Sequence, residues 1–77
     1  MTNEEKVIVA LQKLLGREVP MTGATHLRDD LGLDSANLVE LTVLMHTLHG
    51  VDLGRKAAEH KIIPRTVADV AALLAKP

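Results

Sequence analysis

Aliphatic residues recur at intervals of three and four positions in three segments of the chain, and this spacing restricts the fold more than any other feature. Side chains at that spacing lie on one face of an α-helix. The pattern predicts helices over residues 4–15 and 35–48, and a last helix that opens at Thr66. The apolar faces consist of Val7, Ile8, Leu11, Leu14 and Leu15 in the first helix, Leu38, Leu41, Met45 and Leu48 in the second, and Val67, Val70, Ala71 and Leu74 in the last.

Residues at the ends of these segments are typical of helix caps. Side chains of Thr, Asn and Asp accept hydrogen bonds from the first N–H groups of a helix, and glycine commonly follows the last turn. A weaker pattern predicts a short helix over residues 54–61, which contains Ala57 and Ala58. The candidate caps are Thr2 or Asn3 with Gly16 for the first helix, Asp34 with Gly50 for the second, and Thr66 with Asp69, which resemble a capping box, for the last.

Residues 17–33 follow neither a helical nor a strand period, and they contain two glycines and a proline. We therefore expect a loop. A loop of this length is uncommon in a small domain unless it has a function. The residues expected to hold it against the core are Leu27, Leu31 and Leu33.

With 77 residues, the chain can bury one core and no more. We expect a single domain over residues 1–77. Its predicted fold is all-α: a small four-helix bundle with three main helices, a short third helix and a long loop between the first two.

The apolar residues are all aliphatic or methionine, because the chain has no Phe, Tyr, Trp or Cys although 47% of its residues are hydrophobic. Without cysteine, neither a disulfide nor a thiolate metal site can stabilise the fold, and the protein has no thiol of its own for chemistry. Helix packing must supply the stability. The lack of aromatic side chains also removes the usual means of stacking on nucleic-acid bases.

Charge gives no indication of a nucleic-acid or membrane partner. Nine basic and ten acidic residues are mixed along the chain and give a net charge of -1, so no basic face is available for a phosphate backbone. Apolar stretches are interrupted by charges, and the N-terminal MTNEEK is acidic, where a signal peptide would be basic. We expect a cytoplasmic monomer, either free-standing or cut cleanly from a larger chain.

The spacing of the potential metal ligands does not match a known metal motif. No two histidines lie four positions apart, and the pair at positions 46 and 49 has no third ligand on its helix. The acidic residues at 29, 30 and 34 lack the alternation, central glycine and terminal glutamate of a calcium loop. We expect no metal site, and solvated or capping roles for His26, His46, His49 and His60.

Asp34 and Ser35 open the 35–48 helix directly after the loop. The first turn of a helix has free N–H groups and partial positive charge, which favour a phosphate group attached there. Ser35 has no His or Lys nearby in sequence to act as its own base. The alternative is that Ser35 is an ordinary helix-starting residue.

The sequence around Ser35 resembles the acyl carrier protein family. The residues that carry the resemblance are Leu27, Asp30, Leu31, Gly32 and the Asp34-Ser35 pair, followed by an amphipathic helix and, later, by the Thr-Val-Ala-Asp of residues 66–69. Helices and loop follow the family order over essentially the whole chain. The resemblance implies that Ser35 covalently carries 4'-phosphopantetheine, transferred from coenzyme A by a phosphopantetheinyl transferase with Mg²⁺, and that Asp34 is the motif and cap residue.

The second predicted helix departs from the family pattern in its charge. Family partners usually present Arg and Lys to an acidic second helix, but here Glu40 is followed by no further carboxylate, Ala36 stands where Leu is typical, and Asn37 adds a polar residue. These departures favour a specialised pathway and docking through apolar contact. Partial burial of the apolar residues is the alternative. The expected docking residues are Asp29, Asp30, Ala36, Val39, Glu40 and Val43.

The resemblance implies a carrier and not an enzyme. The thiol of the arm would hold acyl or aminoacyl groups as thioesters, with a loading ligase or acyltransferase and downstream synthases or transferases as partners. Polyketide, nonribosomal peptide or related specialised synthesis is the expected pathway, and primary fatty-acid synthesis is the alternative. A different class is a cofactor-free helical module that docks a partner helix on Val39 and Val43. A hydrolase based on Ser35 is disfavoured, because the chain is too short to build a pocket around a triad.

Overall fold

The computed structural model describes residues 1–77 and consists of four helices, so the predicted all-α fold is confirmed. The third helix begins one residue earlier than expected, because the side chain of Asp52 accepts a hydrogen bond from the N–H of Arg55 and caps it. No helix combines the length and the apolar character needed to span a membrane. The helices are α1 (Asn3–Leu15), α2 (Ser35–His49), α3 (Leu53–His60) and α4 (Val67–Ala75).

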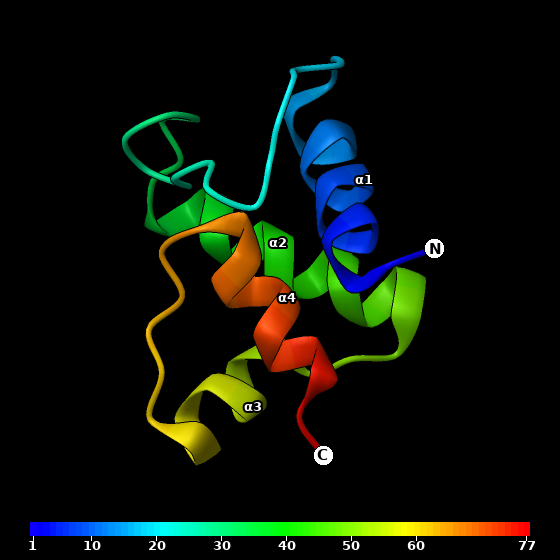
Figure 1. Cartoon of the computed structure of the whole chain (residues 1–77), viewed down its shortest axis with the longest axis vertical. Coiled ribbons are helices and arrows are strands. Elements are labelled where there is room, and N and C mark those ends of the chain that lie inside the picture. Colours follow the sequence, from blue (N-terminus) through cyan, green and yellow to red (C-terminus); the bar gives the residue numbers. More distant parts are fainter.

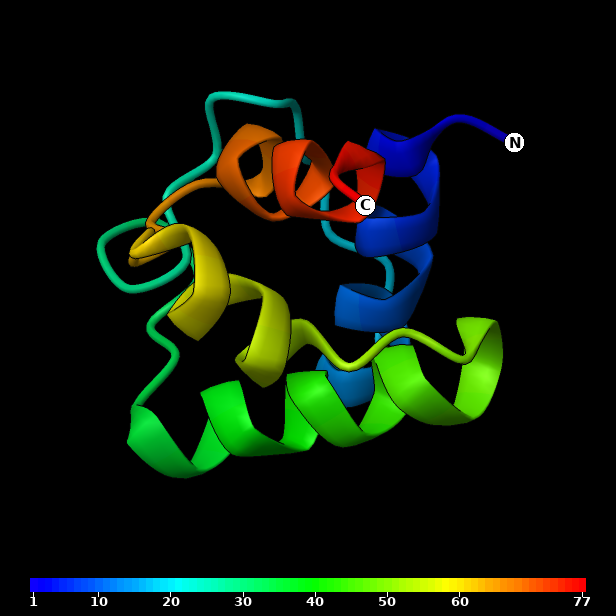
Figure 2. The same ribbon diagram turned by 90° about the horizontal axis from the view of Figure 1, so that it is seen from below.

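The four helices form a closed arrangement in which α1 and α3 each pack against both α2 and α4. Figure 2 shows α2 and α4 on opposite sides of the bundle, with α1 and α3 between them. Each helix therefore buries one face toward a shared centre. The N-terminal end of α2 lies beside the long loop, away from the C-terminus of the chain (Figures 1 and 2).

The core is entirely aliphatic apart from one methionine, as the composition requires. The buried set differs from the expected faces at several positions. Leu73 is fully buried and Leu74 only partly, because α4 contacts both α1 and α3 and so buries a broader face than one stripe. Leu48, in the last turn of α2, is 39% exposed. The buried residues are Val7, Ala10, Leu11, Leu27, Leu33, Leu41, Met45, Leu53, Val67, Val70, Ala71 and Leu73.

The loop between α1 and α2 is held to the bundle by buried leucine side chains and by a backbone hydrogen bond. Leu27 and Leu33 are buried in the core, and Leu31 packs partly against it. The N–H of Leu27 donates to the carbonyl of Arg65 at 2.8 Å, so the loop also bonds to the segment before α4. Gly32 has φ +69°, a left-handed conformation that glycine adopts at little cost, and it turns the chain toward α2.

Candidate functional site

Ser35 is the first residue of α2, and its side chain is exposed. The capping of this helix is carried out by its neighbours. Asp34 Oδ1 accepts a hydrogen bond from the N–H of Asn37 at 2.8 Å, and Asn37 Oδ1 accepts one from the N–H of Asp34 at 3.1 Å. This reciprocal pair is a capping box, so the Ser35 hydroxyl has no capping role. It also gives Asn37 a local structural role.

The free backbone groups at this helix end fit an attached phosphodiester. No group of the protein accepts a hydrogen bond from the N–H of Ser35 or of Ala36, while the N–H of Leu38 donates to the carbonyl of Asp34. Unpaired N–H groups and the helix dipole favour negative charge within the first turn. Ser35 is also the only serine in the chain. The free N–H groups of this helix end therefore favour a phosphate ester on an exposed serine hydroxyl at this position.

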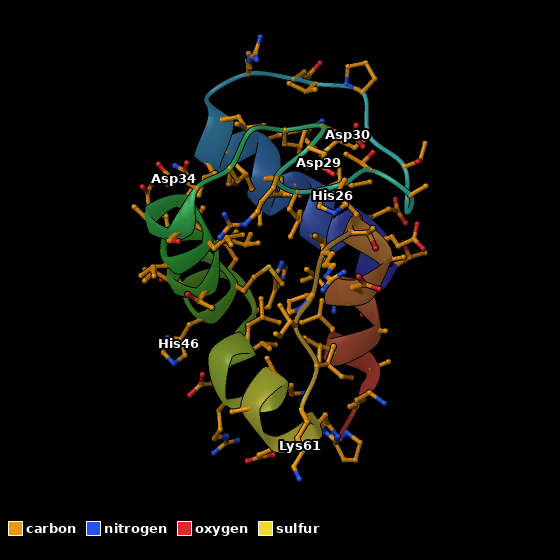
Figure 3. The ribbon with its side chains drawn as sticks, turned by 90° about the vertical axis from the view of Figure 1, so that its left-hand side faces the viewer. His26, Asp29, Asp30, Asp34, His46 and Lys61 are labelled. Carbon is orange, nitrogen blue, oxygen red and sulfur yellow. The ribbon has the colours of Figure 1, made fainter.

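A hydrogen-bonded turn over residues 26–33 places the loop beside Ser35. The N–H of Asp30 and that of Gly32 donate to the carbonyls of His26 and Arg28, at 3.0 and 2.9 Å. Asp30 Oδ2 accepts from the N–H of His26 at 2.7 Å, which closes the turn on itself. Figure 3 shows His26, Asp29 and Asp30 in this turn, at the same end of the molecule as Asp34.

His26 acts as a capping residue within this turn. Its Nδ1 accepts hydrogen bonds from the N–H of Asp29 at 3.1 Å and, less directly, from that of Arg28 at 3.3 Å. Nδ1 is thus the accepting nitrogen of the ring in this turn. Asp29 Oδ2 also lies 3.8 Å from it.

Side chains at all six predicted docking positions are exposed. Val39 is 62% and Val43 60% exposed on the outer face of α2, so the structure does not support their partial burial. Asp30 differs from the others, because its carboxylate also bonds to the backbone of His26. Glu40 forms no hydrogen bond or ion pair with its side chain. The six residues are Asp29, Asp30, Ala36, Val39, Glu40 and Val43.

A groove of about 310 Å³ lies between the 26–33 turn and the segment before α4; we name it the loop groove. A nearly apolar hollow of about 210 Å³ between α2 and α3 adjoins it, and the two share Leu27, Leu38, Ile63 and Pro64. Sequence reasoning identified neither feature, since both depend on contacts between distant segments. The loop groove is lined by His26, Leu27, Arg28, Leu38, Ile63, Pro64 and Arg65.

Arg28 contacts Ser35, and the sequence did not reveal this contact. Its Nη2 donates to Ser35 Oγ at 3.4 Å, and this is the only side-chain hydrogen bond that Ser35 makes. Both residues are exposed, so the contact contributes little to stability. The two residues are seven positions apart in a segment with no helical or strand spacing that would have predicted their contact.

The remaining three histidines occupy two kinds of environment. His46 is exposed and points away from the bundle (Figure 3). His49 and His60 are half-buried, and the Nε2 atom of each is buried without a hydrogen-bond partner, so the expectation that they are solvated or capping is wrong. No three His, Asp or Glu side chains lie close enough together to hold a metal ion.

Comparison with known proteins gives one match. A family model described as "Phosphopantetheine attachment site" matches residues 5–74. No curated protein and no solved structure matches the chain. Domains of this kind are generally carriers that interact with phosphopantetheinyl transferases and biosynthetic enzymes. Because the match covers nearly the whole chain and the fold is the expected helical bundle, the protein belongs to the phosphopantetheine-binding family of acyl carrier proteins, and its cofactor is covalent 4'-phosphopantetheine.

Proposed function

We propose that Ser35 is the residue to which the phosphopantetheine arm is attached. The observation that supports this most strongly is the division of roles at the start of α2: Asp34 and Asn37 cap the helix, and the exposed hydroxyl between them takes no part in the cap. In the attachment step, Ser35 Oγ bonds to the phosphorus of coenzyme A that bears pantetheine. The bond from that phosphorus to the rest of the pyrophosphate breaks, adenosine bisphosphate leaves, and the serine proton passes to a base on the transferase.

Ser35 is an attachment point and has no means to activate itself. Its one side-chain hydrogen-bond partner is Arg28, whose guanidinium is a donor only and cannot accept a proton. This environment argues against a serine hydrolase and in favour of activation by a transferase. Once attached, the arm supplies the thiol that the chain lacks and holds acyl or aminoacyl groups as thioesters.

For the pathway, we propose polyketide, nonribosomal peptide or related specialised synthesis. Glu40 is the only carboxylate on α2, and Val39 and Val43 flank it on the exposed face. Such a surface suits partners that dock mainly through apolar contact, with a loading ligase or acyltransferase first and synthases or transferases afterwards. Primary fatty-acid synthesis, whose partners would rely more on charge, is the second candidate.

Intact mass measures the attachment. Incubation of purified protein with coenzyme A, Mg²⁺ and a broad-specificity phosphopantetheinyl transferase should add one phosphopantetheinyl group to the wild type and none to Ser35→Ala. Thr47→Ala, which removes another exposed hydroxyl on α2, is the matched control and should be modified like the wild type. An unmodified wild type would contradict the proposal.

A cofactor-free interaction module is the alternative from a different class, and the exposure of Val39 and Val43 is the observation that favours it. These two side chains are one helical turn apart and offer an apolar stripe to a partner helix. The same mass measurement separates the two functions. A module would remain unmodified under conditions in which a known carrier is fully converted.

A further inference from the structure

We propose that Arg28 pairs with the phosphodiester that joins the arm to Ser35, and that it thereby holds the base of the arm over the loop groove. This inference rests on the proposed attachment at Ser35. It starts from the distance of 3.4 Å between Arg28 Nη2 and Ser35 Oγ. The unesterified phosphate oxygens are two bonds from that Oγ. A small rotation of the exposed Arg28 side chain brings its N–H groups to them.

Arg28 has no carboxylate partner, although acidic residues surround it in the sequence. The nearest carboxylates are used elsewhere: Asp30 accepts from the N–H of His26, and Asp34 accepts from the N–H of Asn37. The one arginine–carboxylate ion pair in the protein is formed by Arg55 and Glu59, on α3. The guanidinium of Arg28 is therefore free to bind an anion.

The local charge explains why a cation is needed at this point. Attachment adds one negative charge to an end of the molecule that already has Asp29, Asp30 and Asp34 (Figure 3). Like charges at such a site repel one another, and the repulsion is strongest at low ionic strength. A guanidinium offsets it, because its N–H groups match two phosphate oxygens at once.

The backbone of Arg28 is held in place, which makes this residue suited to positioning. Its N–H donates to His26 Nδ1 at 3.3 Å, and its carbonyl accepts from the N–H of Gly32 at 2.9 Å. The side chain lines the loop groove, with Arg65 as a second cation in the same lining. A phosphodiester bound to Arg28 lies at the mouth of this groove, so the arm leaves Ser35 along the groove and not directly into solvent.

The test compares the melting temperature of the loaded form with that of the unloaded form of the same variant, at low and at high salt. Taking the difference within one variant cancels any effect of the substitution on the fold itself. At low salt, this melting difference, loaded minus unloaded, should be roughly 2 to 4 °C lower in Arg28→Gln than in the wild type. At high salt, the two proteins should give the same difference. Arg28→Lys should give a melting difference between those of the wild type and Arg28→Gln, because the positive charge remains. Arg17→Gln, an exposed loop arginine outside the groove, should match the wild type.

A second readout needs no variant. On loading of the wild type, the NMR signal of the Arg28 Nε–Hε group should shift and that of Arg17 should not. An unmoved Arg28 signal, or equal melting differences in Arg28→Gln and wild type at low salt, would overturn the proposal. A melting difference in Arg28→Lys equal to that in Arg28→Gln would also overturn it. Mass spectrometry keeps these failures distinct from failure of the attachment itself, since the latter leaves the wild type unmodified.

Discussion

Asp34 and Asn37 close the start of α2 against each other, each side chain accepting a hydrogen bond from the other's backbone N–H, at 2.8 and 3.1 Å. Ser35 lies between them and takes no part in the cap. The side chains that cap this helix are therefore different from the serine hydroxyl that we propose as the attachment point. This separation explains how Ser35 can be exposed at a capped helix start.

Removing the cap should destabilise the protein, and removing the hydroxyl should not. We expect Asp34→Ala to lower the free energy of unfolding by about 1 kcal/mol, the usual effect of losing an N-cap side chain. Ser35→Ala should change it by less than about 0.5 kcal/mol, because Ala is at least as good a helix former. Urea unfolding of the two variants checks this. Equal destabilisation would give Ser35 a structural role.

Glu40 is the residue that best isolates docking from folding. Its side chain is exposed and makes no polar contact, so Glu40→Lys should change the free energy of unfolding by no more than about 0.5 kcal/mol while it slows loading by the transferase. Rates of loading and melting curves on the same sample measure both effects.

Asp30→Lys should behave differently from Glu40→Lys. It removes the hydrogen bond to the N–H of His26, so we expect a loss of stability of about 1 kcal/mol in addition to slower loading. A loss of about 1 kcal/mol in Glu40→Lys as well would mean that Glu40 has a structural role, and would remove the basis for assigning it to docking.

Leu41 and Val43 lie two positions apart on α2, and truncation to alanine should destabilise the protein far more at Leu41 than at Val43. Leu41 is 2% exposed and belongs to the core, so Leu41→Ala should cost about 2 to 5 kcal/mol, which a domain of this size can barely withstand. Val43 is 60% exposed, and Val43→Ala should cost less than about 0.5 kcal/mol. Thermal unfolding measures both. A large cost at Val43 would contradict its assignment to a free docking surface.

Acid should weaken the start of α4 through Asp69. Hydrogen bonds from the backbone N–H groups of Arg65 and Thr66 hold the pKa of Asp69 below its ordinary value of 3.8. Because the folded state has the lower pKa, the stabilisation is fully present above the unfolded value and is lost as the pH falls through the folded one. Between about pH 5 and pH 2, wild type should therefore lose more stability than Asp69→Asn. Parallel profiles in urea unfolding would contradict this assignment.

Local patterns in the sequence predicted the helices because each helix is specified within its own residues. The spacing around Leu11 and Leu41, the cap at Asp34 and the glycines at 16 and 50 are all read over a few positions, and the structure has them as expected. Leu27 and Leu33 also anchor the loop as predicted.

What the sequence could not predict depends on contacts between distant segments. The bond from Leu27 to Arg65 joins residues that are 38 positions apart, and the loop groove lies between the two segments that this bond brings together. The contact between Arg28 and Ser35 follows from the shape of the 26–33 turn. Burial of His49 and His60 likewise depends on neighbours that no local period reveals.

The most direct test of the central claim is to locate the attached group by fragmentation of the intact loaded protein in a mass spectrometer. Our account predicts one phosphopantetheinyl group on every molecule, confined to fragments that contain Ser35, the only serine in the chain. A group found on a threonine, or no group at all after treatment that converts a known carrier, would contradict it.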